Sequence, residues 1–278
     1  MIKIATMIGA PDLAEKTLAP YSGDLVTAFG KVAELGYEGV ELMTKDPSKL
    51  DGDQISRWLG QHNLEMTGLC TGHMFGEDQL GLVGPDPAVC LRAMERLKGF
   101  VDFAATHFGA GTLINIGRSR GPGYPDDPAT TLDRMEAAFR ELAEYAEPHD
   151  IKLILEPINV HQVNYIHTSQ EGLEMVRRVN HPNFGLMLDV YHMNIEDVDI
   201  YDSFREVGDL CWFVHLADNN RKWPGSAHID FEQIIRVLNE IGYQGYISLE
   251  ILPWPDPDTA AQASIDHLHH LKRKVYGN

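Results

Sequence analysis

The chain has 278 residues, of which 44% are hydrophobic and 23% are charged, a balance typical of a soluble globular protein. Its formal net charge of −18 disfavours nucleic acid as a main partner, because an acidic surface repels a polyanion. No apolar run approaches the roughly 20 residues that a membrane helix needs, and the first residues lack the layout of a signal peptide. The three cysteines lie far apart and fit unpaired thiols in a reducing compartment. We therefore expect a cytoplasmic protein with neither a membrane nor a nucleic acid as partner.

Short apolar runs, each of a length suited to a buried strand, recur eight times along the chain. The segments between them have helical periodicity and helix start signals. Asp86-Pro87 pairs an N-cap residue with a proline at the first helical position, and Thr168 with Glu171 has the spacing of a capping box. The expected strands are 2–7, 38–43, 65–70, 112–117, 151–156, 184–189, 212–217 and 246–251.

Strands that alternate with helices predict right-handed βαβ units and a parallel sheet. Eight such units fit a single (β/α)₈ TIM barrel over residues 1–278. A similarity between two segments supports the barrel, since residues 34–42 and 240–251 both have the pattern of a helix end, a glycine, a turn and a buried strand. An open doubly wound sheet is the alternative, but no glycine-rich first turn supports it. A barrel places its binding loops after its strands, and the longer connections follow strands at 71–85, 117–127 and 217–229.

The last four predicted strands each deliver a side chain that can bind a metal ion. Because the carboxyl ends of parallel strands share one rim, these side chains should converge. Three carboxylates beside one imidazole would repel each other, and buried charges without partners are costly, so a divalent cation is the natural remedy. Three oxygen ligands and one nitrogen suit Mn²⁺, Mg²⁺ or Co²⁺ better than structural Zn²⁺. A lone carboxylate at a strand end is more often an ion-pair or cap partner, but four on consecutive strands favour a metal site. The four residues are Glu156, Asp189, His215 and Glu250.

The positions of the two glutamates around the ring indicate the chemistry. Their strands are the fifth and the eighth, so Glu156 and Glu250 should approach the centre from nearly opposite sides. Such a pair can remove a proton from one face of a carbon and return a proton to the other face. A cation that chelates adjacent substrate oxygens would stabilise the enediolate between the two steps.

Other polar residues near this rim are weaker candidates, since loop residues of this kind are surface groups more often than not. Glu41 closes the second strand and is expected to pair with a neighbouring lysine or arginine. No Ser–His–Asp or Cys–His motif supports covalent catalysis. The weaker candidates are His73, Asn115, Arg118, His192 and Arg221.

Four stretches of the sequence resemble the xylose-isomerase-like barrel superfamily of sugar isomerases and epimerases, and within it the ketose 3-epimerases. The resemblance runs over nearly the whole chain. It implies a TIM barrel, a sugar substrate, a divalent metal with Mn²⁺ as the first choice before Co²⁺ or Mg²⁺, and a homodimer or homotetramer. The stretches are LEPIN (155–159), LDVYHMNIED (188–197), VHLADNNRKWPGSAHIDF (214–231) and GYISLEIL (245–252).

The resemblance also implies roles for single residues. The four converging residues match the family's metal ligands, with Glu156 and Glu250 as its acid/base pair. The implied substrate-binding residues are His73, Gln162, His192 and Arg221. Gln162 stands where the epimerases have an acidic residue, so it can hydrogen-bond a hydroxyl but cannot act as a base. Ala227 stands where a glycine is usual.

We therefore expect a metal-dependent epimerase that inverts C3 of a ketose or a keto-sugar acid. An aldose–ketose isomerase of the hydroxypyruvate or inosose type would use the same ion, although His215 stands where hydroxypyruvate isomerases often carry glutamine. A lyase acting on 3-oxo-glycosides would instead expel an aglycone. An endonuclease of the same barrel family would need more histidine ligands and a basic face. A non-catalytic sugar-binding protein would leave the opposed carboxylates unexplained.

Overall fold

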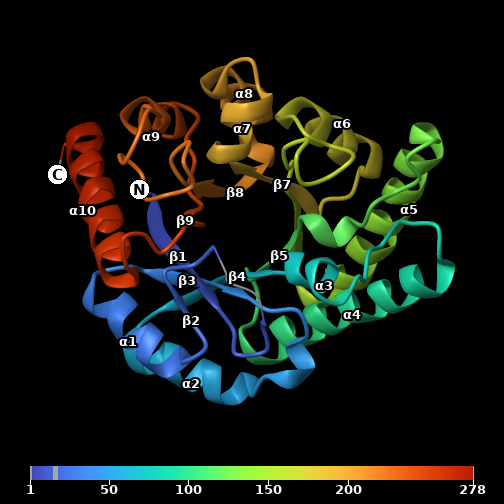
Figure 1. Cartoon of the computed structure of the whole chain (residues 1–278), viewed down its shortest axis with the longest axis horizontal. Coiled ribbons are helices and arrows are strands. Elements are labelled where there is room, and N and C mark those ends of the chain that lie inside the picture. Colours follow the sequence, from blue (N-terminus) through green and yellow to red (C-terminus); the bar gives the residue numbers. More distant parts are fainter. Residues whose placement is uncertain (1, 15–17, 278) are drawn as a thin grey trace.

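The chain folds into a closed barrel of eight parallel strands (Figure 1) in the computed structural model, which describes residues 2–14 and 18–277. Each barrel strand pairs with the next along the chain, and the first pairs with the last, so the sheet closes. A two-residue strand, β2 (Tyr21–Ser22), lies beside the first strand. The expected (β/α)₈ barrel is thus confirmed, with all eight strands in the expected order. They are β1 (Lys3–Gly9), β3 (Gly39–Met43), β4 (Glu65–Cys70), β5 (Leu113–Ile116), β6 (Lys152–Leu155), β7 (Phe184–Asp189), β8 (Cys211–Leu216) and β9 (Tyr246–Leu249).

Helices surround the barrel on its outer face (Figure 1). Two short helices, α3 (Gly72–Gly76) and α7 (Val190–Glu196), lie on the connections that follow β4 and β7. None of the helices in the described part of the chain is long and apolar enough to cross a membrane. The other helices are α1 (Leu25–Glu34), α2 (Gly52–His62), α4 (Pro87–His107), α5 (Pro128–Ala146), α6 (Ser169–Val179), α8 (Ile200–Val207), α9 (Phe231–Glu240) and α10 (Pro257–Tyr276), with single 3₁₀ turns η1 (Pro47–Lys49), η2 (Arg118–Arg120), η3 (Glu147–His149) and η4 (Gly208–Leu210).

The helix start signals act as the sequence predicts. The Asp86 carboxylate accepts the Ala88 N–H at 2.9 Å, directly before the proline that begins α4. Thr168 and Glu171 form the full capping box of α6, in which each side chain accepts the backbone N–H of the other residue. Each cap satisfies amide donors that the first helical turn leaves unpaired.

Inside the barrel, an apolar layer lies below a polar layer. Side chains alternate between the two faces of a strand, so residues two positions apart point to the same side. One buried cluster is made by Leu113, Ile154, Met187 and Phe213, from four consecutive strands. Two positions further along the same four chain segments stand Asn115, Glu156, Asp189 and His215.

The main hydrophobic core fills the space between the barrel and its helices. Phe139 of α5 is fully buried there and stacks on Phe184 of β7, with ring centroids 5.3 Å apart. Because the interior is close-packed, removing such a ring loses burial and leaves a cavity.

We expect Phe139→Ala to lower the free energy of unfolding by about 3–5 kcal/mol, because the buried ring is lost and a cavity is left in its place. Leu91→Ala on α4 is a suitable control, because Leu91 is 61% exposed and its truncation should change stability by less than about 0.5 kcal/mol. Urea unfolding followed by circular dichroism measures both changes. Equal effects for the two variants would contradict this packing.

Candidate metal centre

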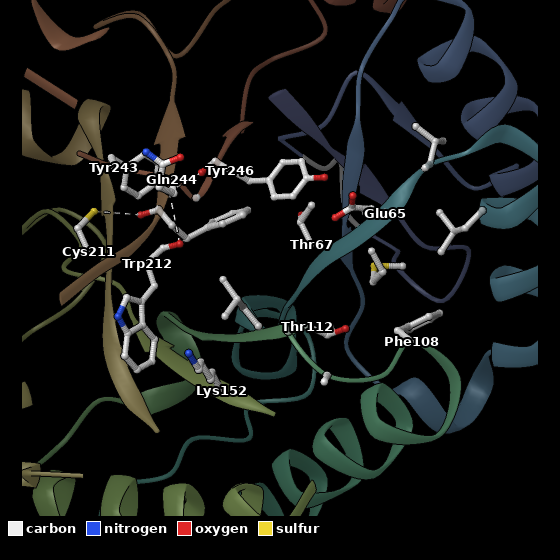
Figure 2. A pocket seen from close by; sticks show the side chains of 18 of the residues that line it. Glu65, Thr67, Phe108, Thr112, Lys152, Cys211, Trp212, Tyr243, Gln244 and Tyr246 are labelled. Carbon is white, nitrogen blue, oxygen red and sulfur yellow. Dashed lines mark hydrogen bonds between the residues drawn. The ribbon is translucent and has the colours of Figure 1, made fainter. Parts of the chain in front are cut away.

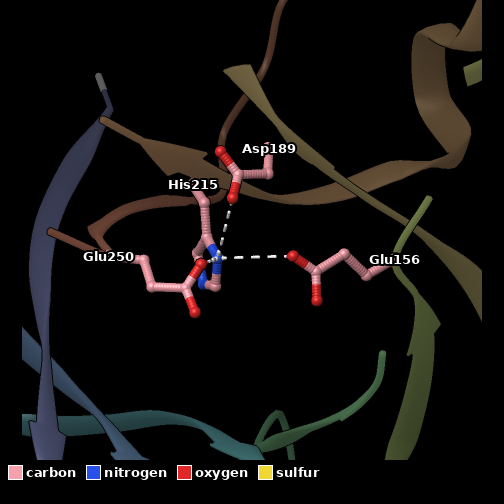
Figure 3. A group of neighbouring side chains, drawn as sticks. All are labelled: Glu156, Asp189, His215 and Glu250. Atoms are coloured by element: carbon pink, nitrogen blue, oxygen red, sulfur yellow. Dashed lines mark ion pairs between the residues drawn. The ribbon is translucent and has the colours of Figure 1, made fainter. Parts of the chain in front are cut away.

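The four predicted ligands converge at the carboxyl end of the barrel (Figure 3). One potential ligand atom from each residue lies within 4.8 Å of the others, and all four side chains are buried. From Nδ1 of His215, the nearest carboxylate oxygens are 3.3 Å away on Glu250, 3.9 Å on Glu156 and 4.0 Å on Asp189. Glu156 and Glu250 reach the imidazole from opposite sides (Figure 3), as their places in the ring predict.

The imidazole of His215 is oriented by Glu41 of β3. Its Nε2 lies 2.7 Å from the Glu41 carboxylate, so Nε2 carries the proton and donates it to this acceptor. Nδ1 is then a lone-pair acceptor, and it is buried without a hydrogen-bond partner among the described residues. A divalent cation would satisfy that nitrogen and balance the three carboxylates, so the residues present fit such an ion. The expectation that Glu41 pairs with a lysine or arginine was wrong, because its partner is His215.

Burial and neighbouring charges shift the pKa values of two of these groups. Burial raises the pKa of Glu156, because the charged carboxylate is poorly solvated there. Burial alone would lower the pKa of His215, but the negative charges of Glu41, Glu156 and Asp189 outweigh it and raise that pKa. Both groups therefore hold protons more readily than exposed residues do, unless a cation competes for them.

Arg221 ties two of the acids together. Its guanidinium donates to Asp189 Oδ2 at 2.5 Å and also contacts the Glu250 carboxylate. Its other support is the ring of Tyr191, whose centroid lies 4.6 Å from the guanidinium carbon. Burial on its own would raise the pKa of Asp189, but the positive charge of Arg221 and its hydrogen bond outweigh burial and lower that pKa. Arg221 therefore lies at the rim formed by the carboxyl ends of the strands, as the sequence predicts.

His192 also lies beside the acids, with Nε2 3.7 Å from Asp189 and 3.9 Å from Glu156. The Asn159 amide nitrogen lies 2.7 Å from His192 Nδ1 and donates to it, which leaves the proton on Nε2. Burial lowers the pKa of His192 to about 3, so the ring is neutral at physiological pH. A neutral imidazole with Nε2–H facing the site can donate to a substrate oxygen. Asn115 also reaches the site, because its amide donates to Glu156 at 3.2 Å.

A buried carboxylate shapes the loop that carries Arg221. Asp218 is fully buried, and within the described residues its carboxylate accepts five backbone N–H groups, at 2.7–3.2 Å. Arg221 adopts a positive φ of 59°, and its N–H donates to the Asp218 carbonyl at 2.8 Å. The sequence analysis missed Asp218, although it stands within the stretch VHLADNNRKWPGSAHIDF, three residues after His215. Ala227, at a position where a glycine is usual, donates its N–H to Asp218 like the other residues of this loop. The donors are Asn219, Gly225, Ala227, His228 and Ile229.

A second missed residue, Arg120, fixes the backbone at Glu156. Arg120 is fully buried, and its guanidinium donates to the Glu156 carbonyl at 2.7 Å. No signal in the sequence marks it, because an arginine between serine and glycine in a loop reads as a surface residue. Its other acceptors are the carbonyls of Gly117, Tyr165 and Ile166.

The structure does not bring every predicted residue to the ligand group. Gln162 lies exposed on the turn after β6, where its backbone N–H donates to the Asn159 carbonyl. His73 lies on α3 and faces Glu77 at 3.3 Å. Arg118 packs near Gly76 of the same helix. A role for Gln162 or His73 in substrate binding stays a prediction.

We expect Glu41→Gln to weaken Mn²⁺ binding by about 10–100-fold, because the neutral amide neither fixes the tautomer of His215 nor strengthens its basicity as the carboxylate does. Glu38→Gln is a matched control on the same segment, because Glu38 accepts the Ile4 N–H, and among the described residues no hydrogen bond or ion pair joins it to His215. Isothermal titration calorimetry measures both dissociation constants. Unchanged affinity in Glu41→Gln would contradict the assigned role.

Mn²⁺ binding should weaken as the pH falls, because Glu156 and His215 must both be deprotonated to act as ligands. Their pKa values are raised, so proton competition begins at a higher pH than it would for exposed groups. The dissociation constant should therefore rise steadily from about pH 8 to about pH 5. A constant value over this range, in calorimetric titrations at stepped pH, would be inconsistent with these two ligands.

The comparisons with known proteins agree with this fold and site. The family described as "Xylose isomerase-like TIM barrel" matches residues 29–271. A ketose 3-epimerase of Arthrobacter globiformis is 30% identical over 79% of this chain and 75% of its own length, and an L-ribulose 3-epimerase of Methylomonas sp. (strain DH-1) is 30% identical over 80% and 77%. The crystal structure of a D-allulose 3-epimerase from Methylomonas sp. has the same fold, with a TM-score of 0.79 and 24% identity, and covers 98% of this chain and 100% of that one. The chain therefore belongs to the xylose isomerase-like TIM barrel family, with ketose 3-epimerases among its relatives.

Proposed function

We propose that this protein is a divalent-metal-dependent epimerase that inverts C3 of a ketose or a keto-sugar acid. The single observation that carries the proposal is the placement of Glu156 and Glu250, two buried carboxylates on opposite sides of one imidazole (Figure 3). Inversion at a carbon next to a carbonyl needs one group on each face, and this arrangement supplies both. The 30% identical relatives are named as a ketose 3-epimerase and an L-ribulose 3-epimerase, which supports the same reaction class.

In this mechanism the two glutamates act on opposite faces of C3, one as a base and the other as an acid. One carboxylate removes the proton from C3, and the other, in its carboxylic acid form, delivers a proton to the opposite face of the enediolate. In the reverse direction the two roles exchange. The carbonyl of Glu156 is held by Arg120 at 2.7 Å, which fixes the carboxylate's starting point at the strand end.

Two further side chains would hold the substrate next to the glutamates. His192 is neutral and presents Nε2–H, so it can donate to the carbonyl or hydroxyl oxygen without adding charge. Arg221 supplies a positive charge beside Asp189 and Glu250. Both groups favour negative charge that develops on oxygen during proton removal.

Glu156, Asp189, His215 Nδ1 and Glu250 would hold the metal ion. A bound divalent cation supplies a Lewis acid that stabilises negative charge on adjacent substrate oxygens. The oxygen-rich donor set favours Mn²⁺, with Co²⁺ and Mg²⁺ as the alternatives.

The reaction predicts that solvent deuterium enters C3 of the recovered ketose when the Mn²⁺-loaded protein is incubated in D₂O. Glu250→Gln should slow this exchange by about 10²–10⁴-fold with the fold intact, because the amide can neither accept nor return the proton. Glu240→Gln, an exposed change on α9, should leave the rate unchanged. Proton NMR of a panel of ketohexoses and keto-sugar acids measures the exchange, and circular dichroism checks the fold.

The same spectra separate the rival reactions. Label at C1 or C2 without label at C3 would identify an aldose–ketose isomerase, and release of a phenol from a 3-oxo-glycoside would identify a lyase. If every ketose and keto-acid sugar stays unlabelled, the proposed epimerase function is wrong.

A further inference from the structure

The two carboxylate oxygens of Glu156 lie in different surroundings. Oε1 faces the ligand group, 3.9 Å from Nδ1 of His215 and 3.9 Å from Nε2 of His192. Oε2 lies on the other side, where the side-chain amide of Asn115 donates to it at 3.2 Å. Figure 3 shows this division, because a dashed line joins one oxygen of Glu156 to the imidazole and the other oxygen points away from it. One oxygen thus faces the place for a cation, and the other is held by the protein.

A glycine leaves the space that Oε2 occupies. A Cβ at Gly117 would lie 2.7 Å from Oε2 of Glu156 and 3.2 Å from the side chain of Ile158. A carbon atom cannot approach an oxygen atom this closely without a hydrogen bond, so a larger residue here would displace the carboxylate or the chain around it. The end of β5 therefore provides both a donor for Oε2 and the room for it.

Two other predicted ligands are divided in the same way. His215 engages Glu41 with Nε2 and turns Nδ1 to the carboxylates. Asp189 accepts the Tyr191 N–H with Oδ1 at 2.9 Å, and its Oδ2 lies 4.0 Å from Nδ1 of His215. In each case a contact within the chain engages the outer atom and leaves the inner atom for a cation. Partners of this kind orient the ligands of metal sites in proteins.

Asn115 has no other polar side-chain contact in the described part of the chain. It is 1% exposed on β5, and its amide nitrogen donates to Glu156 alone among these residues. Its Oδ1 is buried and has no hydrogen-bond partner there. Burial of an amide is costly unless it is hydrogen-bonded, so the contact with Oε2 is the one that accounts for an asparagine at this position.

We propose that Asn115 is a positioning residue, which holds Oε2 of Glu156 away from the metal ion so that Glu156 binds the ion through Oε1 alone. Oε2 then keeps lone pairs that no cation occupies. The next step rests on the proposed function. The C3–H bond of the ketose breaks, its electron pair passes into the enediolate, and the proton forms a bond to Oε2. A carboxylate has about four lone-pair sites, so Oε2 can accept both the Asn115 N–H and this proton.

Loss of the Asn115 donor removes the difference between the two oxygens. Carboxylates bind divalent ions through one oxygen or through both, so the freed Oε2 can turn towards the ion. The oxygen that exchanges the proton would then be misplaced, and a misplacement of about 1 Å can slow a reaction by about 10²-fold.

Crystals grown with Mn²⁺ test the positioning role without any substrate. In the wild type, Oε1 of Glu156 should lie about 2.0–2.4 Å from the manganese, while Oε2 lies outside this range and still accepts from Asn115. In Asn115→Leu, which keeps the size of the side chain but loses the donor, Oε2 should leave this position. Asn115→Ala adds no bulk and provides the same test if Asn115→Leu does not fold. Manganese bound to both oxygens in the wild type, or an unmoved Oε2 in the variants, would overturn the inference.

Deuterium exchange at C3 of the ketose gives the second readout, at saturating Mn²⁺. The kcat for exchange should fall by about 10²-fold in Asn115→Leu, with KM nearly unchanged, because the base is misplaced while the substrate contacts remain. Asn183→Leu is a matched control. Asn183 is also buried, but it lies before β7 at the amino end of the barrel, where its amide donates to the Ile151 carbonyl. It should lose stability and keep the exchange rate. An equal loss of kcat in the two variants would mean that Asn115 is only structural.

The two readouts separate the role of Asn115 from the proposed function. If the wild type exchanges no proton with any ketose, the epimerase function is wrong, and the manganese-bound position of Oε2 still decides the role of Asn115. If exchange occurs while both oxygens of Glu156 bind manganese, the role of Asn115 is wrong and the epimerase function stands.

Discussion

Three carboxylates and one imidazole share a buried space in which their atoms approach within 4.8 Å, and the rest of the site depends on this crowding. Like charges in a poorly solvated space repel strongly, so each needs a compensating partner. Arg221 lies between Asp189 and Glu250 and donates to both carboxylates. Because Nε2 of His215 donates to Glu41, Nδ1 keeps its lone pair for another ligand. A divalent cation at that nitrogen would complete the compensation.

The barrel explains why these groups meet. Strand alternation places apolar side chains one layer below the acids, and Asp218 and Arg120 anchor the loop and the strand end that carry Arg221 and Glu156. The apolar layer, to which Leu113 and Phe213 belong, also separates the metal centre (Figure 3) from the pocket at the amino end of the barrel (Figure 2).

The sequence was sufficient to predict the strands, the barrel and the four converging residues, because each depends on local periodicity and on the shared rim of parallel strands. It was not sufficient for contacts between distant segments. Glu41 was expected to pair with a lysine or arginine, yet it reaches His215, 174 residues away, inside the barrel. Arg120 and Asp218 look like ordinary loop residues in the sequence, and only the folded backbone shows how many carbonyls or amides converge on them.

Anomalous X-ray scattering from a crystal grown with Mn²⁺ tests the central claim most directly. The account predicts one strong manganese peak between Glu156, Asp189, Glu250 and Nδ1 of His215, at distances of about 2.0–2.4 Å from the ligand atoms. It would be contradicted by a map without a peak at this position while Arg221 still bridges Asp189 and Glu250, or by a peak that His215 approaches through Nε2.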